Sequence, residues 1–264
     1  MAYLELSQVS KGYGPRNVLR NLSLEINEGE FVSIVGASGA GKTTLLKIAC
    51  GLLPADSGAV TLAGDRISEF PPVASVIFQN YSLLPWLSAL ENVRLAVQAA
   101  FPRFTMAQQE AHGRKYLEMV GLGQAYLKKP SQLSGGMRQR VAIARAFAVE
   151  PRVLFMDEPF GALDALTRAT LQKELASMCS AQAKPVTALM ITNSVEEAVL
   201  LSDRIHALGS KGLSDGFAVE LKRPRAADAL LHDPEAIAIR NQLAEFLTTG
   251  RKQLAQRLMP VGAF

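Results

Sequence analysis

The sequence predicts an α/β fold in which helices cover a parallel β-sheet, together with an antiparallel β-subdomain and an inserted α-helical subdomain. Continuous apolar runs at 31–35, 153–156 and 186–192 are typical of parallel strands that are covered on both faces. The first thirty residues alternate instead between apolar and polar, which predicts half-exposed antiparallel strands. A long stretch at 88–150 has the pattern of helices. Ligands of such parallel sheets bind at the carboxyl ends of the strands.

The composition is that of a globular protein, because 48% of the 264 residues are hydrophobic and 20% are charged. The net charge of +4 comes from scattered Lys and Arg, whose closest cluster, 222–225, is too small for the basic stripe of a nucleic-acid binder. Cys50 and Cys179 are expected to be reduced core residues of a cytosolic protein. We expect neither a signal peptide nor a membrane span, so any membrane function requires spans from another chain.

The amino-terminal strands are expected at 3–7 and 22–26, with a turn between them at 11–15 that presents Tyr13. A later strand at 59–62 completes a small antiparallel sheet.

The most informative stretch follows the apolar run at 31–35 and precedes a helical pattern from Thr44 to about Gly51. It carries G-x-x-x-x-G-K-[ST], the Walker A phosphate-binding loop of nucleotide triphosphatases, and so predicts a P-loop NTPase (RecA-like) sheet. Glycines let backbone N–H groups face an anion, and the next helix adds its positive N-terminal end. Lys42 can reach the β- and γ-phosphates, and the Thr43 hydroxyl can bind Mg²⁺. The predicted nucleotide-binding residues of this loop are Gly36, Ala37, Ser38, Gly39, Ala40, Gly41, Lys42, Thr43 and Thr44.

Between the phosphate loop and the next motif, a strand is expected at 73–79, followed by helices. A capping box at Thr105–Gln108 and helix stops at Gly121 and Gly123 support the helical interpretation. The apolar segment 81–87, which contains the only tryptophan, is either tucked into a core or offered to a partner.

Two acidic residues, Asp157 and Glu158, close the apolar strand at 153–156. In a P-loop ATPase the carboxylate of Asp157 holds Mg²⁺, often through water, and Glu158 orients and deprotonates the attacking water. The alternative is a solvated acidic pair, which the upstream phosphate loop makes the weaker interpretation.

Ser134, Gly135 and Gly136 open a helix that is expected from Met137 to Val149. Their exposed N–H groups, the serine hydroxyl and the helix dipole form a second anion site. One chain with a single phosphate loop does not need two such sites, whereas two chains facing head to tail do. The alternative is a capped helix with no further role.

The last strand, 186–192, is followed by a helix to about residue 202. The pattern weakens beyond residue 208, and 234–258 suggests one or two terminal helices.

With these motifs in this order, residues 3–208 resemble the nucleotide-binding subunits of ATP-binding cassette (ABC) transporters. The resemblance implies an ABC nucleotide-binding domain at 1–208, with the helical subdomain inserted at about 85–150. Residues 209–264 are then an extension that packs on this domain and is not an independent domain.

The resemblance also implies roles for single residues. Tyr13 would stack on adenine, although a strand-end tyrosine without a role is the alternative. Gln79 would sense Mg²⁺ and the γ-phosphate and relay that state to a membrane partner. Ser134, Gly135 and Gly136 would close on the ATP of the opposite subunit, and Asp164 would cross the dimer interface.

Most members of this family carry a histidine where this chain has Asn193. Asparagine is shorter and stays neutral, so it can donate a hydrogen bond but cannot carry a proton. We expect slower hydrolysis or help from a different partner subunit. The alternative is that Asn193 caps the next helix with Glu196 as its reciprocal partner. The histidines at 112, 206 and 232 are expected to be surface or structural residues.

Finer resemblance points to one group of bacterial importers. The stretches 78–86, 157–168 and 221–225 look like the nitrate, sulfonate, taurine, cyanate and bicarbonate uptake group, and 191–198 looks closest to its nitrate, cyanate and bicarbonate branch. The transported anion is chosen by other chains. The resemblance implies ATP and Mg²⁺ as cofactors, and a second ABC ATPase subunit (the same chain or a paralogue) as partner. It further implies permease subunits docking near 81–87, an indirectly linked periplasmic binding protein, no nucleic acid, and a peripheral place on the cytoplasmic face of the inner membrane.

Two other functions compete with an importer ATPase. A soluble ABC-class ATPase for nucleic-acid or ribosome work usually has two cassettes or a long coiled-coil insertion, and the interval between Lys42 and Ser134 is ordinary helical sequence. A weakly hydrolysing regulatory nucleotide binder rests on Asn193 alone, and Glu158 opposes it.

Overall fold

The computed structural model describes residues 2–180, 185–209, 212–222, 225, 230 and 232–258. The chain divides into two compact units, each described here by itself. The first unit comprises Met1–Phe70 and Leu189–Phe264, and the second comprises Pro71–Ala188. Arg223 and Pro224, part of the stretch used above for the resemblance, lie outside the described residues. No helix in the described part of the chain is both long and apolar enough to cross a membrane.

A four-stranded antiparallel sheet forms part of the first unit, as the alternating pattern predicts. Its strands are β1 (Leu4–Tyr13), β2 (Arg16–Ile26), β4 (Ser57–Leu62) and β5 (Asp65–Arg66), in the order β2-β1-β4-β5. The apolar positions of β1, such as Leu4 and Leu6, are buried, and the polar positions between them are not. The turn expected at 11–15 is shorter than expected, because β1 extends to Tyr13 and only residues 14 and 15 turn.

The first unit also contains parallel strands, with β3 (Phe31–Gly36) buried along its whole length. Its strands follow the order β10-β9-β3-β8, and β3 runs parallel to β9. The other members are β8 (Thr187–Thr192), which enters this unit at Leu189, β9 (Arg204–Gly209), β10 (Gly212–Leu213) and β11 (Phe217–Ala218). The helices of the first unit are α1 (Lys42–Ala49), α6 (Val195–Leu201) and α7 (Pro234–Leu258).

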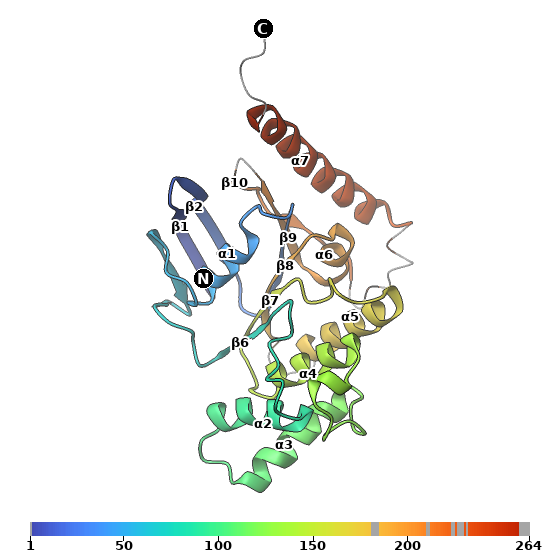
Figure 1. The fold of residues 1–264 in the computed structure, drawn as a ribbon. Helices are drawn as coiled ribbons and strands as arrows, with labels where there is room; N and C mark the ends of the chain where they lie inside the picture. Colours follow the sequence, from blue (N-terminus) through green and yellow to red (C-terminus); the bar gives the residue numbers. More distant parts are fainter. Residues whose placement is uncertain are drawn as a thin grey trace. The chain divides into compact units, whose positions relative to one another are not determined.

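The terminal helix α7 packs on the same core as the parallel strands. It runs beside β9 and α6 (Figure 1) and adds Ala236, Ile239 and Leu243 to a buried cluster that includes Val35 at the end of β3. Residues 234–258 form one helix, which decides between the one or two expected from the sequence.

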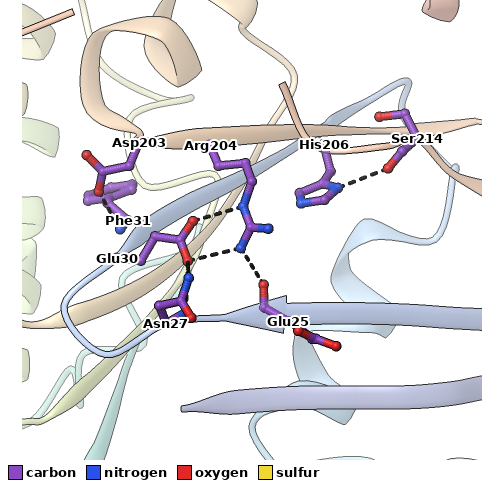
Figure 2. A network of polar contacts seen from close by, with 8 residues as sticks. All are labelled: Glu25, Asn27, Glu30, Phe31, Asp203, Arg204, His206 and Ser214. Atoms are coloured by element: carbon purple, nitrogen blue, oxygen red, sulfur yellow. Dashed lines mark hydrogen bonds and ion pairs between the residues drawn. The ribbon is translucent and has the colours of Figure 1, made fainter. Parts of the chain in front are cut away.

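A polar network fixes the start of β9 against the turn between β2 and β3 (Figure 2). The Arg204 guanidinium forms an ion pair with Glu30, with Nε 2.8 Å from Oε1, and donates to the backbone carbonyl of Glu25. The neighbouring Asp203 carboxylate accepts the backbone N–H of Phe31 at 2.8 Å. Ends of segments far apart in sequence are thereby held where β3 begins.

The second unit pairs β6 (Ala74–Ile77) in parallel with β7 (Val153–Asp157). Its helices are α2 (Ala89–Ala100), α3 (Met106–Met119), η1 (Pro130–Gln132, a 3-10 turn), α4 (Gly135–Phe147) and α5 (Ala165–Ser180). Of these, α2, α3 and α4 lie together in Figure 1. The capping box predicted at Thr105–Gln108 is confirmed, since each side chain bonds the other's backbone N–H. Gly121, at φ 71°, follows the end of α3 as the predicted helix stop.

Both cysteines are buried and neither forms a disulfide, as expected. Burial raises the pKa of the Cys50 thiol to about 11, so this thiol stays protonated and unreactive at neutral pH.

The imidazole of His206 on β9 gives the fold a pH dependence. Its side chain is buried at 7% exposure, and its Nδ1 lies 2.9 Å from the Ser214 carbonyl oxygen. Burial, with a smaller contribution from Arg204, lowers its pKa below the ordinary value of 6.5. The unfolded chain therefore binds the proton first as the pH falls. The contribution of neutral His206 to the free energy of unfolding is complete above about pH 6.5. It decreases as the pH falls below that value, until the pKa of His206 in the folded state is passed.

We expect urea unfolding to give a lower free energy at about pH 5.5 than at about pH 7.5, by at most about 1.4 kcal/mol for each unit of pKa depression. His206→Gln should reduce this pH difference, because the buried group no longer titrates. His232→Gln, at an exposed position, should leave it unchanged. If the wild-type chain and both variants show the same change in the free energy of unfolding between the two pH values, His206 is not the cause of the pH dependence.

Candidate nucleotide-binding and catalytic residues

The predicted phosphate loop connects β3 to α1 in the first unit. Gly39 and Gly41 have φ of 78° and 100°, in the left-handed region, and residues of that conformation turn successive backbone N–H groups toward one point. Gly41 is also the N-cap of α1 and makes no side-chain cap, so the first N–H groups of the helix are left to another acceptor. The loop therefore has the backbone geometry of an anion cradle.

Lys42 follows the cradle as the first residue of α1 and is only 5% exposed. Its ammonium group donates to the backbone carbonyls of Gly36 at 2.9 Å and Ala37 at 3.3 Å. The charge is thus held against the loop itself, where phosphate oxygens would replace or join the carbonyls. Thr43, one residue later, is exposed.

Tyr13 lies at the end of β1 with 52% of its surface exposed. The backbone just before it is held by Asp56, whose carboxylate accepts the Gly12 N–H at 2.8 Å and pairs with Lys11 at 2.5 Å. An exposed aromatic ring on a fixed strand end has the form of a stacking platform.

Asn193 is an exposed residue in the turn between β8 and α6. Its suggested role as a helix cap is wrong, because the N-cap is Ser194, whose hydroxyl accepts the Glu197 N–H at 3.2 Å. The Thr192 hydroxyl donates to the buried Glu197 carboxylate at 2.7 Å and accepts the Ser194 N–H at 3.0 Å. The turn that carries Asn193 is therefore fixed from both sides.

In the second unit, Asp157 ends β7 and is nearly buried, and Glu158 follows it with φ 45°. The Gln79 side chain, from the loop after β6, donates its amide N–H to the Glu158 carboxylate at 3.3 Å. Two residues that lie 79 positions apart in the sequence are thus brought together.

Ser134, Gly135 and Gly136 form the start of α4, as predicted. The Ser134 hydroxyl accepts the Met137 N–H at 3.2 Å, which confirms the serine cap. A Cβ on Gly136 would lie 2.6 Å from the Thr167 methyl group, whereas a Cβ on Gly135 would be 3.5 Å from the Tyr81 hydroxyl. Only the second glycine is thus required by packing within this unit.

Asp164 lies just before α5 and is exposed. Its carboxylate accepts the Thr167 N–H at 3.0 Å, and this bond lowers the pKa of Asp164. Asp164 is thus ionised and fixed at neutral pH.

Two features of these sites were not predicted, and the local sequence contains a signal for only the first of them. Ser194 stands three residues before Glu197, a spacing of helix caps that could have identified it. Tyr81 and Ser82 both have left-handed backbones, with φ of 64° and 46°, at a cost of about 1–2 kcal/mol for each such residue. Neither is a glycine or asparagine, so nothing in the local sequence indicates this conformation.

The residues proposed for Mg²⁺ fit that ion chemically. They are a hydroxyl, an amide and a carboxylate, from Thr43, Gln79 and Asp157, and Mg²⁺ prefers such oxygen ligands. It commonly binds one or two carboxylates together with phosphates and water, and needs no cluster of acidic side chains. The described residues contain no such cluster of three or more His, Cys, Asp or Glu.

These features define a P-loop nucleotide-binding cassette with a second, serine-capped helix start. The sequence profile of the ABC transporter family matches residues 19–161, more than half of the chain. The chain belongs to the ABC transporter family. The predicted fold class and the predicted activity, an ABC-type ATPase that binds ATP, are confirmed.

Curated relatives cover most of the chain. It is 44% identical over 253 residues to the bicarbonate transport ATP-binding protein CmpD of Synechocystis sp., covering 93% of this chain and 89% of the relative. It is 44% identical to the nitrate import ATP-binding protein NrtD of Synechococcus elongatus, covering 89% and 86%. The chain spans about a third (35%) of the bicarbonate transport ATP-binding protein CmpC of Synechocystis sp., with 46% identity.

Among solved structures, the chain is similar to the ATP-binding cassette MJ0796 in a dimeric post-hydrolysis state bound to ADP and Pi. The TM-score is 0.74 at 30% identity, over 83% of this chain and 100% of that one.

The two glycines of the helix start should respond differently to alanine. Gly136→Ala should lower the free energy of unfolding by about 1–3 kcal/mol, because the new methyl overlaps that of Thr167. Thr167→Ser in the same chain should restore most of the loss. Gly135→Ala should change stability by less than about 1 kcal/mol. Chemical denaturation checks all three, and equal losses for the two glycines would contradict the packing argument.

Proposed function

We propose that this chain is the ATP-hydrolysing subunit that energises a bacterial importer of small anions of the nitrate and bicarbonate type. The observation that carries the proposal is its 44% identity, along most of both chains, to proteins named for bicarbonate transport and nitrate import. These names favour a transport ATPase over a soluble ABC-class ATPase for nucleic-acid or ribosome work.

The residues would divide the work between two faces of a dimer of cassettes. The cradle from Gly36 to Thr44, with Lys42, binds the phosphates of ATP, and Tyr13 stacks on the adenine ring. The Ser134 hydroxyl and the N–H groups of the α4 start close on the nucleotide of the opposite chain, and Asp164 crosses the interface. Dimeric structures of a related cassette support this arrangement.

Hydrolysis would depend on Glu158. Its carboxylate orients the attacking water and takes its proton, while Asp157, Thr43 and Gln79 hold Mg²⁺, which supplies charge neutralisation at the phosphates. The hydrogen bond from the Gln79 amide occupies one oxygen of the Glu158 carboxylate. Gln79 must therefore release this oxygen before it can bind the attacking water, which links hydrolysis to the position of the loop that carries Gln79.

The permease would dock near Tyr81–Leu87. In this segment Pro85 and Trp86 are exposed, Trp86 at 65%, and the leucines are half-buried. An exposed tryptophan beside apolar side chains is typical of a protein interface. The chain would then be peripheral on the cytoplasmic face of the inner membrane and linked indirectly to a periplasmic binding protein.

The proposed domain division also stays a prediction: a cassette at 1–208 with a helical subdomain at about 85–150, and an extension at 209–264.

Glu158→Gln tests the proposed function. The amide keeps the shape of the side chain but cannot take a proton, so ATP turnover should fall by about 100-fold or more. The variant should form ATP-dependent dimers in size-exclusion chromatography, and Ser134→Glu in the same chain should abolish them by repelling the phosphates. A wild-type chain without ATPase activity, together with a variant that stays monomeric with ATP, would refute the function.

Asn193→His tests the departure from the family pattern. An imidazole reaches further and can carry a proton, so turnover should rise several-fold if Asn193 touches the reacting phosphate. The measurement is the turnover rate at saturating ATP. Asn193→Ala is the matched control, because it removes the side-chain amide without adding an imidazole. An unchanged rate in both variants would remove Asn193 from the catalytic account.

A further inference from the structure

The helix start that carries Ser134 and the loop that carries Gln79 are joined in the second unit by a set of contacts that the proposed function does not use. Tyr81 and Ser82, immediately after this loop's Gln79-Asn80, adopt two successive left-handed conformations. Such a backbone persists only where surrounding structure determines it. The local bonds, from Tyr81 N–H to the Phe78 carbonyl and from Ser82 N–H to the Asn80 carbonyl, close the turn but leave the carbonyls of Tyr81 and Ser82 outside it.

Arg145 binds those two carbonyls. Its guanidinium donates to the Tyr81 carbonyl oxygen at 2.8 Å and to the Ser82 carbonyl oxygen at 2.5 Å. A planar guanidinium presents its N–H groups as a fixed fork, so it recognises the two carbonyls only in the orientation that the left-handed pair provides. Arg145 is partly buried, and desolvation lowers its pKa, although the group remains charged. A desolvated cation whose partners move away is costly, so the loop and the guanidinium must move together.

The side chain of Tyr81 touches the other end of the same helix face. The Arg138 guanidinium lies 5.6 Å from the centre of the Tyr81 ring, and the Tyr81 hydroxyl is 3.5 Å from the Cβ position of Gly135. Arg138 and Arg145 are about two turns apart on α4, which places them on one face of the helix. Tyr81 is therefore in contact with α4 at two places. Its ring lies against the start of the helix, and its backbone carbonyl binds Arg145 near the end of the helix.

We propose that Arg145 is a positioning residue that locks the loop after Gln79 to the start of α4, so that the Gln79 amide and the Ser134 cap are set as one body. The inference rests on the proposed function for the roles of Gln79 and Ser134. If Gln79 left Glu158, its displacement would pass through the Tyr81 and Ser82 carbonyls to α4. Arg145 thus reports the state of one ATP site to the lid of the site on the opposite chain.

Arg145→Lys is the principal variant, because lysine keeps the charge but cannot reproduce the two-pronged geometry. Arg140→Lys is the matched control. Arg140 lies on the same helix and also binds a backbone carbonyl, that of Val120 at 2.7 Å, as well as Glu174, but it does not touch the loop. Arg145→Lys should lower kcat by about 10- to 100-fold, while the Kd for ATP measured without Mg²⁺ stays within about twofold. Arg140→Lys should change both by less than about twofold.

A purely structural role for Arg145 makes a different prediction for a second substitution. Ser82→Gly removes the cost of the left-handed backbone and keeps both bonds from Arg145, which go to backbone carbonyls, at the loss of one exposed bond from the Ser82 hydroxyl to the Asn80 side-chain oxygen. Added to Arg145→Lys, it should restore the melting temperature but not kcat. Recovery of kcat together with stability would show that Arg145 only supports the turn, and would overturn the proposal.

Hydrogen–deuterium exchange decides the mechanical claim without any ATP hydrolysis. In the nucleotide-free chain, Arg145→Lys should speed exchange at 80–84 and at 135–138 together. Arg140→Lys should not speed exchange in these two segments together. Faster exchange in the loop alone would overturn the lock. If the two segments respond together, but the wild-type chain does not hydrolyse ATP and the Glu158→Gln variant stays monomeric with ATP, the lock stands and the proposed function fails.

Discussion

The first unit is organised around the loop between β3 and α1, which has the backbone geometry of an anion cradle. This geometry places Gly39 and Gly41 in left-handed conformations, and the start of α1 has no side-chain cap. Such a loop is held in place only if the strand before it is immobile, and β3 is buried along its length with β9 beside it. The contacts of Arg204 and Asp203 at the other end of β3 serve the same purpose. Lys42 meanwhile rests on loop carbonyls, so its charge is never left without acceptors.

The second unit stores backbone strain where its state is expected to change. Tyr81, Ser82 and Glu158 all have left-handed backbones although none is a glycine. Their carbonyls and side chains meet Arg145 and Gln79, so the strained positions lie at the contacts between segments and not within helices or strands. Residues in such conformations cluster in proteins at sites that switch between arrangements.

The sequence predicted the order of motifs, the two kinds of sheet and the serine cap of α4, because each depends on local chemistry. The spacing of Gly36, Gly41 and Lys42 has one physical use, and the Thr105–Gln108 capping box reads directly from four residues. What it could not contain was long-range geometry. The bond between Gln79 and Glu158 and the grip of Arg145 depend on tertiary folding, and local propensity gives no sign of either. Asn193 shows the opposite error, in which a plausible local role was taken by the neighbouring Ser194.

The packing of α7 sets a limit on how this architecture can be enlarged. Ala236, Ile239 and Leu243 share a buried cluster with Val35, which lies near the end of β3 that leads into the phosphate loop. A segment inserted between β9 and α7 would leave this buried cluster intact only if its two ends lay close together on the surface. Leu247, still within α7, also packs against that cluster, so an insertion within this part of the helix would disturb it. The terminal helix is therefore part of the core that supports the end of β3, and shortening the chain before Leu243 would open that core.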